Sequence, residues 1–187
     1  MMQSHGFDDR SRRWWQDPES ILKSAGVMRG MTVADLGCGS GFFTIPLGSM
    51  VGEAGKVFAV DSRPAALERL RENLNSVTRS VVRTVQADVS KTSIPSSSVD
   101  VAFVSNLLHD IDDKAEFMLE VRRMLKPTGR LVVVDWRRIE MEFGPPLEIR
   151  LDEKSVREIL KAGGFEITDT LKPDPYHYGF VATQMNS

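Results

Sequence analysis

The sequence predicts an α/β protein with a doubly wound, mostly parallel seven-stranded sheet that ends in an antiparallel hairpin. Short apolar runs, most of them rich in valine, alternate with amphipathic stretches along the 187 residues. This alternation is typical of parallel strands covered by helices on both faces. The last two runs are joined only by residues 172–175, which are too few for a helical crossover, so these two strands should pair antiparallel.

The expected elements follow in order along the chain. Asp17 and Pro18 predict an N-cap and first turn for a short helix that ends near Ser24. Strands are expected at 32–36, 56–61, 80–86, 99–105, 130–136, 165–171 and 177–184. Helices are expected between them at 41–50, 64–77, 113–126 and 151–162. Residues 137–150 are irregular and leave the carboxyl end of a strand, so they are either a wall of a ligand pocket or a simple connector.

Composition limits the class of partner and the compartment. A net charge of -2 argues against a protein that binds nucleic acid by neutralising phosphates. The single cysteine, Cys38, excludes a disulfide framework and a multi-thiolate metal site, which fits a reducing cytoplasm. No apolar run approaches the ~20 residues that span a bilayer, and charged residues interrupt the region where a signal peptide would lie. We expect a cytoplasmic protein with a small-molecule partner, no metal and no membrane insertion.

We expect one globular domain over residues 31–187, preceded by an N-terminal arm and helix over residues 1–30 that act as a lid. Trp14 and Trp15 lie in this arm. They either dock the arm on the body of the protein or form part of a cover over a ligand. The sequence leaves both interpretations open, and it does not predict the oligomeric state.

The turn after the first strand, from Gly37 to Gly41, contains three glycines in five residues and indicates a ligand site. A dinucleotide motif would place its third glycine at position 42, where this chain has Phe42, and would bind a pyrophosphate. Asp35 at the mouth of the turn would repel a pyrophosphate but would attract a cationic amino group. These features resemble the class I S-adenosylmethionine (SAM)-dependent methyltransferases, in which an acid precedes such a glycine turn.

The resemblance covers residues from about 32 to 184 and implies a Rossmann-like methyltransferase fold with SAM as the cofactor. It implies that Asp61 binds the ribose hydroxyls, that Asp88 binds the adenine amino group, and that Ser105 and Asn106 line the methionine part of SAM. The full set of expected cofactor-binding residues is Asp35, Gly37, Cys38, Gly39, Gly41, Asp61, Ser62, Asp88, Val89, Ser105 and Asn106. Each acid also has a structural alternative, because Asp35 and Asp61 could cap helices and Asp88 could form a turn. Cys38 is expected to act as a small buried hydrophobe.

The predicted chemistry is transfer of a methyl group to a small molecule by in-line displacement, which depends mainly on alignment and desolvation. His109 follows the fourth strand and is the candidate general base, with packing against the sheet as the alternative. His177 is expected to be part of the last strand. The chain is loosely similar to the small ubiquinone/menaquinone-type methyltransferases. The alternatives are a SAM-binding protein without transferase activity and a nucleotide-cofactor oxidoreductase.

Overall fold

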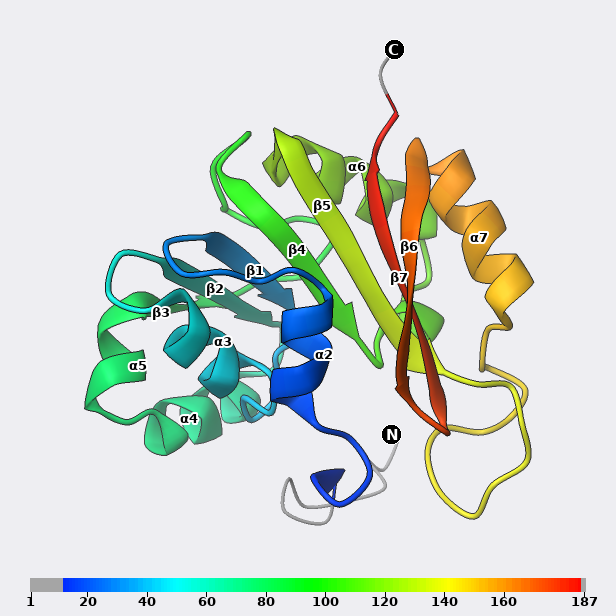
Figure 1. Cartoon of the computed structure of the whole chain (residues 1–187), viewed down its shortest axis with the longest axis horizontal. Helices are drawn as coiled ribbons and strands as arrows, with labels where there is room; N and C mark the ends of the chain where they lie inside the picture. Colours follow the sequence, from blue (N-terminus) through cyan, green and yellow to red (C-terminus); the bar gives the residue numbers. More distant parts are fainter. Residues whose placement is uncertain (1–11, 186–187) are drawn as a thin grey trace.

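A seven-stranded sheet in the order β3-β2-β1-β4-β5-β7-β6 forms the centre of the fold in a computed structural model that describes residues 12–185 (Figure 1). The strands are β1 (Thr32–Leu36), β2 (Lys56–Asp61), β3 (Val82–Gln86), β4 (Val99–Ser105), β5 (Leu125–Trp136), β6 (Phe165–Asp174) and β7 (His177–Gln184). The β1–β5 strands pair in parallel, and β7 pairs antiparallel with both β5 and β6. The predicted fold class and the C-terminal hairpin are therefore confirmed.

The strand order reverses at β1, which pairs with β2 on one side and with β4 on the other. Leu36 at the end of β1 is in register with both Val60 and Val104. The carboxyl ends of three strands therefore meet at one edge of the sheet. In open α/β sheets the crevice at such a reversal is the usual ligand site.

Helices cover both faces of the sheet, and the valine-rich strands are buried from both sides. The helices are α2 (Pro18–Ser24), α3 (Thr44–Val51), α4 (Pro64–Asn73), α5 (Ser76–Val81), α6 (Lys114–Met124) and α7 (Glu153–Ala162), with a short 3₁₀ turn at Leu108–Asp110. Val33 packs in the cluster that contains residues of α2 and α3, whereas its neighbour Ala34 packs in the cluster that contains residues of α6 and α7. This alternation follows from the two-residue period of a strand.

Several element boundaries differ from the sequence prediction, among them the start of α3 at Thr44 rather than residue 41 and the end of β6 at Asp174 rather than residue 171. The helix expected at 64–77 is two helices, because Leu74 leaves the helical conformation and the Asn75 side chain caps α5 by accepting a hydrogen bond from the Thr78 amide. As a result β3 begins at Val82 rather than at residue 80. The fifth strand begins early, at Leu125, which pairs with Val99 before residues 126–129 bulge out of the sheet.

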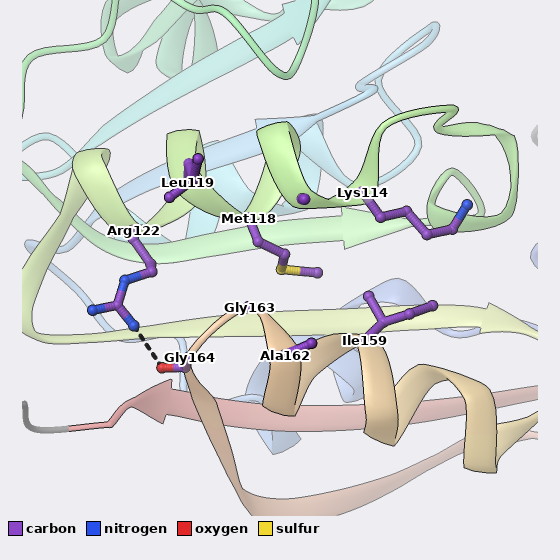
Figure 2. Close-up of a pocket in the computed structure, with 9 residues that line it drawn as sticks. Lys114, Met118, Leu119, Arg122, Ile159, Ala162, Gly163 and Gly164 are labelled. Carbon is purple, nitrogen blue, oxygen red and sulfur yellow. Dashed lines mark hydrogen bonds between the residues drawn. The ribbon is translucent and has the colours of Figure 1, made fainter.

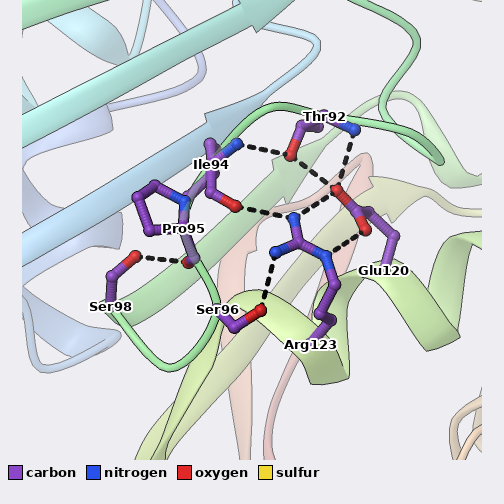
Figure 3. Close-up of polar contacts among 7 residues, drawn as sticks. All are labelled: Thr92, Ile94, Pro95, Ser96, Ser98, Glu120 and Arg123. Atoms are coloured by element: carbon purple, nitrogen blue, oxygen red, sulfur yellow. Dashed lines mark hydrogen bonds and ion pairs between the residues drawn. The ribbon is translucent and has the colours of Figure 1, made fainter.

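A buried acid on α6 fixes the segment that connects β3 to β4 (Figure 3). Glu120 accepts hydrogen bonds from the amide of Thr92 (2.8 Å) and from its hydroxyl (2.6 Å). Arg123 binds the same carboxylate through Nε at 2.7 Å and also donates to the carbonyl of Ile94 at 2.7 Å. The network therefore holds the connection that begins beside Asp88.

None of the helices in residues 12–185 is long and apolar enough to cross a membrane.

Replacement of Glu120 by Gln should lower the free energy of unfolding at pH 7 by on the order of 2 kcal/mol. The hydrogen bond from Arg123, with those from Thr92, lowers the pKa of Glu120 from 4.5 to about 2, and one pKa unit is about 1.4 kcal/mol before screening at the partly exposed Arg123. Because the folded-state pKa is lowered, this stability is present above pH 4.5 and is lost as the pH falls towards 2.

Urea unfolding at pH 7 and pH 3 would measure this difference, with Glu158→Gln on the exposed face of α7 as the matched control. Equal unfolding free energies for the wild type and Glu120→Gln at pH 7 would contradict a stabilising role for the network.

Candidate functional site

Two adjoining cavities lie at the sheet edge where the carboxyl ends of β1, β2 and β4 meet. The larger cavity has a volume of about 660 Å³ and the smaller about 180 Å³, and both are bordered by Gly37 and Asn106. Of the eleven residues expected to bind a cofactor, all except Gly41 line one or both cavities. Asp61, Ser62, Asp88 and Val89 lie in the larger cavity, and the smaller one contains Asp35, Cys38, Gly39 and Ser105.

The glycine turn has two packing positions and one open position. A Cβ atom on Gly37 would lie 2.7 Å from Cδ2 of Leu107, and one on Gly41 would lie 2.5 Å from Cδ1 of Leu70. A Cβ atom on Gly39 would meet no atom of the described residues within 4 Å. Gly37 and Gly41 therefore permit close packing, whereas Gly39 borders open space in the smaller cavity. This explains why Gly41 does not line a cavity.

Asp35 places a desolvated carboxyl group at the end of β1. Its residue is 3% exposed, and its Oδ2 atom accepts a hydrogen bond from the hydroxyl of Thr44 at 2.5 Å. Burial raises the pKa of Asp35 to about 7, although the Thr44 hydroxyl and the positive charge of Arg12 act in the opposite direction. The N-terminus of α3 has no side-chain cap, so Asp35 does not serve the capping role that was the structural alternative.

Asp61, at the end of β2, is bound by groups from two sides. Its Oδ2 atom accepts a hydrogen bond from the amide of Gly39 at 3.0 Å, and Arg63 donates to the carboxylate through its amide, Nε and Nη2 at 2.9 to 3.1 Å. Burial alone would raise the pKa of Asp61, but these bonds hold it below its ordinary value. The side chain of Arg63, which lines the larger cavity, is thus hydrogen-bonded to both oxygens of the Asp61 carboxylate.

Asp88 forms a turn at the border of the larger cavity, and its contact with adenine stays a prediction. It borders the larger cavity, and its Oδ1 atom also accepts a hydrogen bond from the Ser90 amide at 2.8 Å. Such a turn orients the carboxylate while leaving its other oxygen for a second partner.

Ser105 and Asn106, at the end of β4, present unsatisfied polar atoms. Ser105 Oγ and Asn106 Oδ1 are buried and have no hydrogen-bond partner among the described residues. Asn106 also has a φ of +54°, a conformation that costs energy for a residue with a side chain. Buried polar groups are normally satisfied, so these two atoms indicate a position where a ligand supplies the partner.

His109 is hydrogen-bonded to a buried carboxylate and does not line either cavity. Its Nδ1 atom lies 2.7 Å from Oδ1 of Asp135 at the end of β5, and its amide donates to Oδ2 of the same residue. Burial lowers the pKa of His109, but the hydrogen bond and charge of Asp135 outweigh this effect and raise it. The side chain is only 3% exposed and lines neither cavity.

An aromatic wall lies at the carboxyl end of β5. It consists of Trp15, Trp136, Phe143, Tyr176 and His177. His177 begins β7, as expected, and its ring stacks on Trp15 with an interplanar angle of 4°. Its Nδ1 atom is 2.8 Å from Oδ1 of Asp174. Trp136 ends β5, which runs parallel to β4 and β1, so this wall lies at the same edge of the sheet as the cavities.

Residues 137–150 are organised around one buried arginine. Arg150 is 4% exposed and donates hydrogen bonds to the carbonyl oxygens of Ile139 (2.8 Å), Phe143 (2.9 Å) and Pro145 (2.8 Å). The segment therefore has a defined conformation and presents Phe143 to the aromatic wall. Its role as a wall of an acceptor pocket remains a prediction.

Comparisons with known proteins agree with this geometry. A family model described as a methyltransferase domain matches residues 34–133. The chain belongs to this methyltransferase family. A solved SAM-dependent methyltransferase from Aquifex aeolicus is 32% identical, with a TM-score of 0.87 over 95% of this chain and 98% of that one. A type 11 methyltransferase structure from Sulfolobus solfataricus is 33% identical, with a TM-score of 0.79 over 92% and 95% of the two chains.

The ubiquinone/menaquinone biosynthesis C-methyltransferase UbiE of Escherichia coli is 32% identical over 158 residues, which are 84% of this chain. The chain spans only 61% of the length of that relative. The similarity to the ubiquinone/menaquinone type that the sequence indicated is thus confirmed at the level of the domain.

The cofactor of this methyltransferase family is SAM, and the residues present fit it. Asp61 and Asp88 line the larger cavity, and their carboxylates can accept hydrogen bonds from a nucleoside. SAM carries no phosphate, so its binding does not require a cation at this position. The smaller cavity contains an acid for an ammonium group, and it ends at the unsatisfied Ser105 and Asn106 atoms. Burial raises the pKa of Cys38, which is consistent with its expected role as a small hydrophobe.

Sequence reasoning missed two cations of this site, Arg12 and Arg63. Both line the smaller cavity, and Arg63 also lines the larger one. Arg63 could have been suspected because it lies two residues after Asp61, whereas no sequence signal places Arg12 beside a turn that is more than 20 residues away.

An apolar groove between α6 and α7 lies apart from these cavities (Figure 2). It has a volume of about 460 Å³, and none of its lining residues borders either cofactor cavity. Met118 and Ile159 point into it, and at one end Arg122 donates a hydrogen bond to the carbonyl of Gly164 at 2.8 Å.

Replacement of Asp35 by Asn should stabilise the cofactor-free protein at pH 8. The pKa of Asp35 is raised from 3.8 to about 7 by folding, so ionisation opposes folding increasingly between these two values. At about 1.4 kcal/mol per unit, the gain reaches at most about 4 kcal/mol and is small near pH 4.

Urea unfolding of both proteins at pH 4.5, 6 and 8 would measure this gain, and the exposed Asp169→Asn is the control. A gain that does not increase with pH would show that the Asp35 carboxyl group is not destabilised by burial.

Proposed function

We propose that this chain transfers a methyl group from SAM to a small-molecule acceptor in the cytoplasm by in-line displacement. The observation that carries the proposal is the pair of cavities at the reversal of the sheet, where Asp35 and Asp61 end two strands and the polar atoms of Ser105 and Asn106 lack partners. SAM supplies an electrophilic methyl group on a sulfonium centre.

The residues divide between the two ends of the cofactor. Asp61 accepts hydrogen bonds from the ribose hydroxyls after Arg63 moves aside, and Asp88 accepts one from the adenine amino group, with Ser62 and Val89 beside it. Asp35 binds the ammonium group, which restores a charge partner to a desolvated acid. Ser105 and Asn106 bind the methionine part of SAM, so the methyl group lies near the end of β4.

The acceptor is a small molecule methylated at oxygen, nitrogen or carbon. The net charge of -2 does not favour a nucleic acid. The aromatic wall beside the cavities offers apolar surface that excludes water from the reacting atoms. Alignment of the acceptor with the methyl group and sulfur accounts for most of the acceleration.

His109 is the proposed general base where the acceptor must lose a proton. Its Nδ1 atom faces Asp135, which fixes the ring and leaves Nε2 to accept a proton. Nε2 lies 3.6 Å from Oδ2 of Asp110, a residue that lines the larger cavity, so the ring is next to that cavity.

Calorimetric titration with SAM and with NAD(H) tests the cofactor assignment. The wild type should bind SAM, and Asp61→Ala should weaken binding by about 10- to 100-fold because each charge-assisted hydrogen bond to the ribose is lost. Arg63→Ala is the matched control, since it frees the carboxylate and should retain binding. Tight binding of NAD(H) without binding of SAM would contradict the proposal, and an unchanged affinity of Asp61→Ala would show that the ribose site lies elsewhere.

The base assignment predicts that His109→Ala loses most turnover while it keeps its affinity for SAM. Formation of S-adenosylhomocysteine with a panel of hydroxyl, amine and activated-carbon acceptors would measure turnover. Because Asp135 raises the pKa of His109, wild-type turnover should increase with pH through a value above 6.5 as the imidazole becomes neutral. Full turnover by His109→Ala would remove the base assignment and leave the methyltransferase assignment intact, whereas absence of turnover in the wild type with every acceptor would favour a protein that only binds SAM.

A further inference from the structure

The apolar groove between α6 and α7 is bordered by positive charge and by no negative charge. Its lining includes Lys114 and Arg122, and no acid among the described residues borders it. Both cations lie on α6, and the eight positions from 114 to 122 correspond to about 12 Å along a helix. Figure 2 shows them at opposite ends of the groove, with Met118 between them. The charges of the groove therefore favour a negatively charged ligand.

The guanidinium group of Arg122 is positioned by the turn between α7 and β6. Its Nη1 atom donates a hydrogen bond to the carbonyl oxygen of Gly164 at 2.8 Å. A Cβ atom on Gly164 would clash with the same nitrogen, so the guanidinium group occupies space that a side chain would otherwise take. The N–H donors of Arg122 that do not bind Gly164 have no acceptor within residues 12–185. A guanidinium group fixed in this way can bind a carboxylate in a bidentate fashion.

The rest of the groove offers apolar contacts for a chain-like molecule. Met118 and Ile159 point into it from the two helices, and Leu119 beside them is 68% exposed. The short side chains of Ala115 and Ala162 also line it. Its volume of about 460 Å³ lies in the range of ~300 to 1,000 Å³ that is typical of small-molecule sites, which combine an apolar lining with a few well-placed polar groups.

The surface around the groove does not suit a protein partner. Stable protein interfaces bury roughly 800 Å² on each partner around an apolar core. Of the large hydrophobic residues that are exposed within residues 12–185, only Leu119 lies on α6 or α7. On α7, the side chains of Lys154 and Glu158 are 86% and 70% exposed. A single slender ligand needs only the groove itself, so the observations favour a small molecule.

We propose that this groove binds a long-chain fatty acid as its carboxylate. The carboxylate pairs with Arg122, and the alkyl chain lies over Met118 and Ile159 towards Lys114. The ammonium group of Lys114 donates to the carbonyl oxygen of Ile111 at 2.7 Å and is directed away from Met118, so the methylene groups of Lys114 cover the far end of the chain. None of the lining residues borders the cofactor cavities, so the proposal does not rest on the proposed function.

Calorimetric titration with three amphiphiles, below the concentrations at which they form micelles, tests the class of ligand. The wild type should bind one dodecanoate per chain. Octanoate should bind at least about 10-fold more weakly, because each CH₂ group that is buried contributes to affinity. Dodecyltrimethylammonium has the same chain with a positive charge and should bind about 10- to 100-fold more weakly than dodecanoate, the range for loss of a charge-assisted pair. Equal affinities for the anionic and cationic amphiphiles, or no binding of dodecanoate, would overturn the proposal.

Two variants test the location of the site. Arg122→Gln should weaken binding of dodecanoate by about 10- to 100-fold, because the charged partner of the carboxylate is lost. Leu119→Glu should weaken it by at least about 10-fold, because it places a negative charge beside the groove, and it should fold because residue 119 is exposed. Val77→Glu, at a 52% exposed position of α5, is the matched control and should stay within about twofold.

Urea unfolding would verify that each variant folds, and the affinity of Leu119→Glu for SAM should equal that of the wild type. An unchanged affinity of Leu119→Glu for dodecanoate would place the ligand elsewhere and overturn the proposal. Sedimentation velocity would detect a protein contact at the same face. Self-association of the wild type that Leu119→Glu abolishes, without binding of dodecanoate, would overturn the proposal in favour of a second copy of the chain.

Discussion

The parallel pairing of β1 with both β2 and β4 is the constraint on which the site depends. It brings three carboxyl ends to one edge, and the turn that follows β1 passes close to Leu107 at Gly37 and to Leu70 at Gly41. The φ values of +80° and +103° at these two positions favour glycine. The same pairing buries Asp35 below the turn, so its carboxyl group is desolvated, and within residues 12–185 the charge of Arg12 and the Thr44 hydroxyl offset this only in part. The strand pairing that builds the sheet therefore also builds the candidate site, and the burial of ionised Asp35 lowers the free energy of unfolding.

Features that depend on local sequence were predictable, and features that depend on contacts between distant segments were not. Strand alternation and the glycine turn follow from periodicity and spacing, whereas the acids at 61 and 88 were implied by the resemblance to the methyltransferases. Asp35, Asp61 and Asp88 all border the two cavities. The break at Asn75 depends on a single side-chain cap, and the bulge before Arg130 depends on pairing with β4. The position of Arg12 at the cavity depends on how the arm packs over Phe42.

His109 and His177, at this edge of the sheet, are each hydrogen-bonded at Nδ1 to an aspartate, but the two pairs connect different strands. His109 and Asp135 join the end of β4 to the end of β5 and add to the backbone pairing there. His177 and Asp174 close the tight turn between β6 and β7 and contact the arm through Gln16. In both pairs the carboxylate fixes the tautomer, so the orientation of each ring is set by the sheet and not by the ligand.

The arginine that covers Asp61 differs from a gate in one respect. Arg63 makes three hydrogen bonds to the carboxylate, yet its side chain is 66% exposed. Exposed side chains change rotamer in picoseconds to nanoseconds, far faster than a ligand arrives by diffusion. With SAM placed as proposed, Arg63 therefore competes with the nucleoside for the Asp61 carboxylate at equilibrium, and it lowers the affinity for the nucleoside without delaying its entry.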